Sequence, residues 1–141
     1  SRHNLARAYK LAGQHDRAIP LHESTLEREE RTIGVNHPNT LHSRHRLAEA
    51  YQAAGQLKQA IDLFERTLVD RERVLSADHP DILESRNSLA EAYQADGQLE
   101  RAIPIYERTL ADCERVLTPL IHPLTVKVRD NLARAREAAE K

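Results

Sequence analysis

The sequence predicts an all-α fold, an α–α superhelix or solenoid of about seven antiparallel helices. Three observations lead to this class. Apolar residues recur at helical spacing, strand-like alternation of apolar and polar residues is missing, and the pattern repeats every 42 residues. Residues 38–79 and 80–121 are identical at 25 of 42 positions, which chance similarity does not give. One helix pair cannot bury its apolar face alone, so neighbouring repeats should stack in a row.

The first repeat, residues 1–37, is expected to begin inside a helix, because Ser1 corresponds to Ser43 of the next repeat. The first turn of that helix and its leading proline are then missing, which predicts an open apolar end. The polar residues 134–141 suit a terminal cap instead. These two ends favour the interpretation that the chain is the C-terminal part of a longer protein.

The second repeat, residues 38–79, contains two helices. The first should run from Pro38 to about Ala54, because proline is tolerated at the first helical position. Gly55 should end it by adopting a left-handed conformation. The apolar spacing predicts the second helix over residues 57–75.

The third repeat, residues 80–122, follows the same plan and is extended by one residue in its final loop. A capping helix is expected over residues 123–141, and the whole chain is assigned to a single domain. Pro20 and Pro104 fall early in the second helices, where we expect them to bend each helix without ending it.

Five positions of each repeat carry a family resemblance. They are Leu47, Ala48, Tyr51, Ala60 and Phe64 in the second repeat, and Leu89, Ala90, Tyr93, Ala102 and Tyr106 in the third. This pattern resembles the tetratricopeptide repeat (TPR), which is about 34 residues long in its standard form. The longer repeat here is similar to those of kinesin light chain and nephrocystin-like proteins and of bacterial TPR proteins. His22 replaces the aromatic residue of the first repeat, which predicts looser packing there.

The resemblance implies a protein–protein interaction scaffold whose first helices line a concave face. Helical spacing away from the buried stripe predicts which residues face a partner. They are His3, Asn4, Arg7, Lys10, His42, His45, Arg46, Glu49, Asn87, Glu91, Asn131 and Arg134. The N-terminal half of this set is basic, so a peptide or protein with acidic groups should prefer it. Solvated charges on an exposed face are the alternative interpretation of each residue.

The resemblance also implies that asparagines at the sites of Asn4 and Asn131 can hold the backbone of a ligand. Arg46 and Ser88 occupy the equivalent sites between them, so this clamp is interrupted. The i,i+4 charge pairs of the second helices suggest a solvated convex face and contribute only a few tenths of a kcal/mol each. These pairs are Arg66 with Asp70 and Arg108 with Asp112.

Chemistry other than binding has little support in the sequence. No phosphate loop or catalytic triad pattern occurs, so an enzyme and a cofactor are not expected. The turn histidines His37, His79 and His122 should satisfy backbone groups rather than bind metal, and Cys113 should be an exposed, incidental thiol. A formal net charge of −1 argues against nucleic acid. The absence of a signal peptide or long apolar run predicts a cytoplasmic protein that does not enter membranes.

Two other functions remain open at this stage. The open N-terminal end would suit homo-oligomerisation through self-association. Arrays of this kind also follow nucleotide-binding signalling ATPases and transcriptional activators in bacteria, so the chain could be the sensor arm of a regulatory ATPase.

Overall fold

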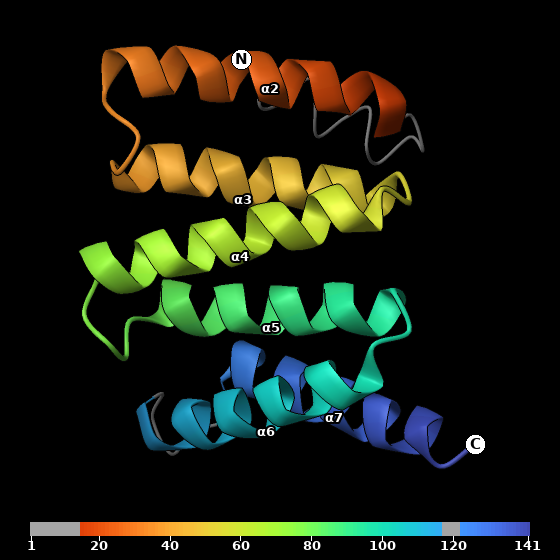
Figure 1. Ribbon diagram of the computed structural model, residues 1–141. Helices are drawn as coiled ribbons and strands as arrows, with labels where there is room; N and C mark the ends of the chain where they lie inside the picture. Colours follow the sequence, from red (N-terminus) through yellow and green to blue (C-terminus); the bar gives the residue numbers. More distant parts are fainter. Residues whose placement is uncertain (1–14, 117–121) are drawn as a thin grey trace. The chain divides into compact units, whose positions relative to one another are not determined.

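Six helices occupy the part of the chain that the computed structural model describes, residues 15–116 and 122–141 (Figure 1). The chain divides into two compact units, residues 1–74 and 75–141. The first unit holds α2 (His15–Thr32), α3 (Pro38–Ala53) and α4 (Leu57–Val74), and the second holds α5 (Pro80–Ala95), α6 (Leu99–Val116) and α7 (Pro123–Ala139). The all-α prediction is confirmed. The seventh helix, expected before Gly13, lies outside the described residues.

Helix boundaries fall within one residue of those predicted for the second repeat. α3 ends at Ala53 and α4 at Val74, against expected ends near Ala54 and Leu75. Gly55 follows α3 with φ +81°, and Gly97 follows α5 with φ +79°. Glycine adopts this left-handed conformation without the steric penalty of a Cβ atom, so it ends both helices cleanly.

A histidine begins α3, α5 and α7 in the same way. The imidazole Nδ1 atoms of His37, His79 and His122 each accept a hydrogen bond of 3.0 Å from the backbone N–H two residues further on. A proline follows each histidine at the first helical position. The prediction that these histidines satisfy backbone groups is therefore confirmed, because each side chain caps one otherwise unpaired N–H.

Replacing His79 with alanine should lower the free energy of unfolding by about 1 kcal/mol, because the N–H of Asp81 loses its acceptor. His79→Asn keeps a capping acceptor and should cost only a few tenths of that amount. Urea unfolding followed by circular dichroism measures both values. Equal losses in the two variants would contradict a capping role for His79.

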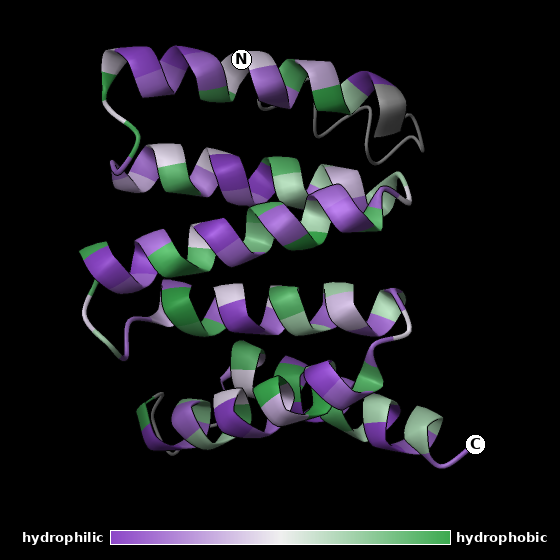
Figure 2. Ribbon diagram, in the orientation of Figure 1, coloured by the Kyte–Doolittle hydropathy of each residue, from purple (hydrophilic) through white to green (hydrophobic). Residues whose placement is uncertain are grey.

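The core of the first unit forms where α3 packs against both α2 and α4. Phe64 of α4 is 1% exposed, and the small residues Ala48 and Ala60 are completely buried. Alanines at these positions allow close approach of neighbouring helices, as the repeat pattern predicted. His22 is also buried, so the imidazole takes the core position that an aromatic residue holds in the other repeats. Hydrophobic and hydrophilic residues both occur along every helix that the structure describes (Figure 2).

The core of the second unit centres on Tyr106, which is completely buried in α6. Cys113 lies two turns further along the same face and is also completely buried. The expectation that Cys113 is exposed is therefore wrong. Burial raises the pKa of its thiol, an effect partly opposed by a hydrogen bond with Thr125. A buried thiol with a raised pKa is a poor nucleophile.

Proline is accommodated inside two of the second helices. α2 continues through Pro20 and α6 continues through Pro104, so neither residue ends its helix. Each is the sixth residue of its helix, so each removes one intrahelical hydrogen bond, but the helix continues on both sides of it.

Candidate partner-binding site

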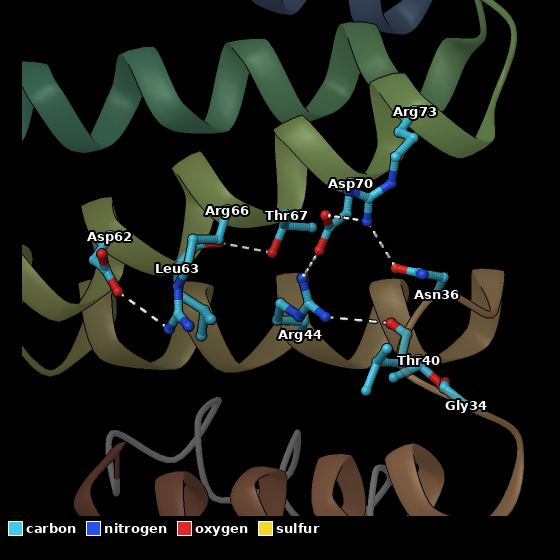
Figure 3. Close-up of polar contacts among 11 residues, drawn as sticks. Gly34, Asn36, Thr40, Arg44, Asp62, Leu63, Arg66, Thr67, Asp70 and Arg73 are labelled. Atoms are coloured by element: carbon cyan, nitrogen blue, oxygen red, sulfur yellow. Dashed lines mark hydrogen bonds and ion pairs between the residues drawn. The ribbon is translucent and has the colours of Figure 1, made fainter.

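A buried ion pair joins the two helices of the second repeat. Arg44 of α3 donates to Asp70 of α4 at 2.5 Å and to the carbonyl of Val35 at 3.2 Å (Figure 3). Arg73 also donates to Asp70, at 2.7 Å. The predicted pairing of Arg66 with Asp70 is wrong. Arg66 instead contacts Asp62 at 3.1 Å, because the Asp70 carboxylate turns towards α3.

The same ion pair recurs in the second unit. Arg86 of α5 donates to Asp112 of α6 at 2.9 Å, and Arg115 contacts the same carboxylate at 3.2 Å. The expected pairing of Arg108 with Asp112 is replaced in the same way. Sequence reasoning missed these pairs, although both partners recur at an offset of 42 residues and would have revealed them. The pairs fix each first helix against its second helix and so orient the remaining faces of the first helices.

One such face, on α5 and α7 of the second unit, brings together four of the predicted site residues. The Asn131 side-chain amide donates to Asn87 Oδ1 at 3.1 Å and to Glu91 Oε2 at 3.0 Å. Arg134 donates to Asn131 Oδ1 at 2.5 Å. Residues three or four apart share one helix face, which places Asn87 beside Glu91 and Asn131 beside Arg134. We call these four residues the α5–α7 cluster.

Two further residues, Tyr106 and Gln94, border the α5–α7 cluster. The Tyr106 hydroxyl donates to Gln94 Oε1 at 3.0 Å. Burial raises the pKa of Tyr106, the Glu91 carboxylate raises it further, and Arg134 partly opposes the shift. The hydroxyl therefore keeps its proton at neutral pH. The sequence places Tyr106 in the apolar stripe of its helix, so the hydrogen bond of its hydroxyl was not predicted. The polar atom of a buried tyrosine usually needs a partner, which is the signal that could have indicated it.

The first unit presents a second polar face on α3. His42 is exposed, and its Nε2 atom accepts a hydrogen bond of 3.3 Å from Arg46 Nε. Glu49 lies one turn beyond Arg46 and is partly exposed. We call His42, Arg46 and Glu49 the α3 face. It carries one positive charge at Arg46 beside an imidazole, and one negative charge at Glu49.

Two predicted site residues are not on an open surface. His45 is 2% exposed and meets the Phe64 ring edge-on at 5.3 Å, and Asn87 is completely buried. The expectation that both lie on an exposed face is wrong, because their helix register turns them towards neighbouring helices. Asn131 is largely buried too, whereas Arg134 is exposed and Glu91 is partly exposed. His3, Asn4, Arg7 and Lys10 lie outside the described residues.

The α5–α7 cluster and the α3 face offer hydrogen-bonding groups of several kinds. The accessible ends are guanidinium groups, carboxylates and an imidazole, which together can pair with peptide backbone and charged side chains. Within residues 15–116 and 122–141, no three His, Cys, Asp or Glu side chains gather closely enough to hold a metal ion. None of the helices in these ranges has the length and apolar character needed to cross a membrane.

The fold and its repeated helix pairs define an all-α repeat protein of the α–α solenoid class. The sequence model of the tetratricopeptide repeat family matches residues 1–69 and 45–115. The chain belongs to the tetratricopeptide repeat family. This fold is a non-enzymatic interaction scaffold, and TPR repeats generally mediate protein–protein interaction.

Solved structures agree with this assignment. The nearly identical TPR-like repeats of a Podosopora anserina protein, described as a kinesin light chain, are 37% identical with a TM-score of 0.89. BtubC (BKLC) from P. vanneervenii is 20% identical with a TM-score of 0.85, which shows the fold alone. Each comparison covers 99% of this chain, but only 65% of the first protein and 55% of the second.

A third similar structure contains a bound partner. The TPR2AB domain of yeast Sti1, solved in its complex with pHSP90, is 22% identical with a TM-score of 0.68. The comparison covers 99% of this chain and 47% of that one, so it also shows the fold alone. A search of curated proteins found no match.

Proposed function

We propose that the chain binds a protein or peptide segment through the polar faces of its first helices. The α5–α7 cluster is the principal site in the second unit. One hydrogen bond carries this proposal. The side-chain amide of Asn131 on α7 donates to Asn87 on α5, 44 residues earlier in the sequence, and so connects two first helices. Glu91 of α5 is partly exposed and Arg134 of α7 is exposed, and both bond to Asn131, so these two residues form one polar surface.

Charge and hydrogen bonding in the α5–α7 cluster favour a peptide ligand. Arg134 is exposed, and Glu91 can accept a backbone N–H while Arg134 binds a carbonyl or carboxylate. An incoming backbone would exchange hydrogen bonds with Glu91 and Arg134, each of which is bonded to the largely buried Asn131. Such an exchange costs little when each lost bond is replaced.

The α3 face should set a preference for acidic groups in the partner. His42 and Arg46 lie one turn apart and together favour a carboxylate. Arg7 and Lys10 would extend this basic character, as the sequence predicts. The complex of Sti1 with pHSP90 supports the general kind of partner, a protein segment, and nothing more specific.

A charge reversal at Arg134 tests the α5–α7 cluster. The probes are peptides selected for binding to the wild-type chain from a random displayed library. We expect Arg134→Glu to weaken their binding by tenfold or more, which corresponds to about 1.4 kcal/mol. Arg136→Glu is the matched control. Arg136 is equally exposed on α7, but it contacts Glu107 of α6 at 2.9 Å instead of the cluster. Fluorescence anisotropy measures each affinity, and circular dichroism verifies that both variants are folded.

The control variant should stay within about twofold of the wild-type affinity, since a rim charge away from the contact changes binding little. The selected peptides should also be rich in Asp and Glu and should lose affinity with Arg46→Glu. Equal affinities for wild type and Arg134→Glu would contradict the proposed site.

A further inference from the structure

A groove runs along the first unit between its two second helices, α2 and α4, with α3 beneath it. Its volume is about 650 Å³. It lies apart from the α3 face, because α3 contributes Arg44, Leu47 and Tyr51 to it and contributes neither His42 nor Arg46. The groove is thus a surface that the proposed function does not use.

The lining of the groove includes four aliphatic side chains, Leu26, Leu47, Leu63 and Val69. Leu47 and Leu63 are buried, whereas Val69 is 57% exposed, more than any other large hydrophobic residue that the structure describes. The equivalent position in the next repeat is Ala111, so the exposed valine is particular to this groove. An apolar side chain left this open beside a depression marks a contact for a partner.

The walls of the groove are acidic. Four carboxylates line it, from Glu30, Asp62, Glu65 and Asp70, against the two guanidinium groups of Arg44 and Arg66. Both guanidinium groups are engaged with carboxylates of the groove itself, at 2.5 Å to Asp70 and 3.1 Å to Asp62. Arg73, outside the lining, also contacts Asp70 at 2.7 Å, so the groove keeps a small excess of negative charge. An excess of one sign in a depression attracts ligands of the opposite sign.

The dimensions of the groove suit a helix laid along it. On α4 the lining extends from Gln59 to Asp70, which corresponds to roughly 18 Å at 1.5 Å per residue. That length matches about three helical turns. A whole helix is about 10 Å wide, and the groove is a depression that is open to solvent along its side. A docked helix would therefore insert only one of its faces.

We propose that this groove docks a basic amphipathic helix of a partner protein. Its apolar side chains lie over Leu26, Leu63 and Val69, and its Lys or Arg side chains meet Glu30 and Glu65. This surface lies on the second helices and favours basic ligands. The proposed function uses the first helices and favours acidic ones, so the two sites are independent.

A designed peptide pair tests the groove on the full chain. One probe is a 14-residue amphipathic helix of Leu and Lys, and the other has Glu in place of every Lys. We expect Val69→Lys to weaken binding of the Leu/Lys peptide by tenfold or more. Val74→Lys, on the same helix and also exposed but outside the groove, should change it by about twofold or less. The double variant Glu30→Lys with Glu65→Lys should prefer the Leu/Glu peptide.

Three outcomes would overturn the proposal. The first is an equal loss of affinity in Val69→Lys and Val74→Lys, and the second is a double variant that still prefers the Leu/Lys peptide. The third is dimerisation of the chain that Val69→Lys abolishes, which would make a second copy the occupant. Arg134→Glu should leave Leu/Lys binding unchanged. If Arg134→Glu removed binding of the Leu/Lys peptide and Val69→Lys did not, the groove proposal would be rejected. The proposed site on the first helices would not be affected by that result.

Discussion

Replacing Asp112 with alanine is expected to lower the free energy of unfolding by about 3 kcal/mol. The substitution removes the carboxylate that Arg86 contacts at 2.9 Å, and the Arg86 side chain is only 10% exposed. A guanidinium left in this environment loses its counter-charge and cannot recover full hydration, which makes breaking a buried pair costly. Asp112 itself is 20% exposed, so we place the loss at the lower end of the range for buried pairs.

Asp62→Ala is the matched control for this prediction. Asp62 contacts Arg66 at 3.1 Å, but both side chains are about two-thirds exposed, so the pair should contribute at most 1 kcal/mol. Urea unfolding of both variants gives the comparison directly. A loss in Asp112→Ala no larger than the loss in Asp62→Ala would show that the recurring Arg–Asp pair does not hold the helices together.

Replacing Phe64 with alanine should cost about 3–5 kcal/mol, the range for removing a buried aromatic ring. Phe64 is 1% exposed, and its ring meets the imidazole of His45 edge-on. The cavity left behind closes only in part, because the side chains around a deleted ring relax only partially. A typical domain has only about 5–15 kcal/mol of stability, so the midpoint of unfolding should fall markedly.

Val74→Ala provides the comparison for the cavity. Val74 lies on the same helix and is 42% exposed, so shortening it should change stability by about 0.5 kcal/mol or less. In thermal and urea unfolding, the midpoint of Phe64→Ala should be far below the midpoint of Val74→Ala. Similar unfolding midpoints would contradict the placement of Phe64 in the core.

The helical architecture could be predicted from the sequence because specific residues in each repeat mark where its helices begin and end. Proline after histidine marks the start of α3, α5 and α7, and glycine marks the end of α3 and α5, since proline and glycine both act through the local backbone. The misplaced Cys113 shows where this reasoning fails. The equivalent of Cys113 in the second repeat is Arg71, and an arginine usually indicates an exposed position, but Arg71 is itself buried in the structure.

The candidate site was predictable in part. Helical spacing correctly placed Glu91 beside Asn87 and Arg134 beside Asn131, because residues three or four apart lie on one face. Helical spacing does not show how much of each face a neighbouring helix covers. The burial of His45 and Asn87 was therefore not predicted. The bonds of Asp70 were missed because long side chains can choose a partner on another helix instead of one turn away.

Several predictions from the sequence are left for experiment. Self-association would appear as a concentration-dependent mass in light scattering. A role as the sensor arm of a regulatory ATPase depends on the protein that contains this chain. The cytoplasmic location also stays a prediction.

Chemical-shift mapping of a bound peptide tests the central claim, that partners bind the first helices. The complex should be formed with a peptide selected on the wild-type chain and recorded with ¹⁵N-labelled protein. We predict that the side-chain amide signals of Asn131 and Gln94 and the backbone signals around Glu91 and Arg134 shift on titration. Shifts confined to the outer surfaces of α4 and α6, with the Asn131 amide unchanged, would contradict the account.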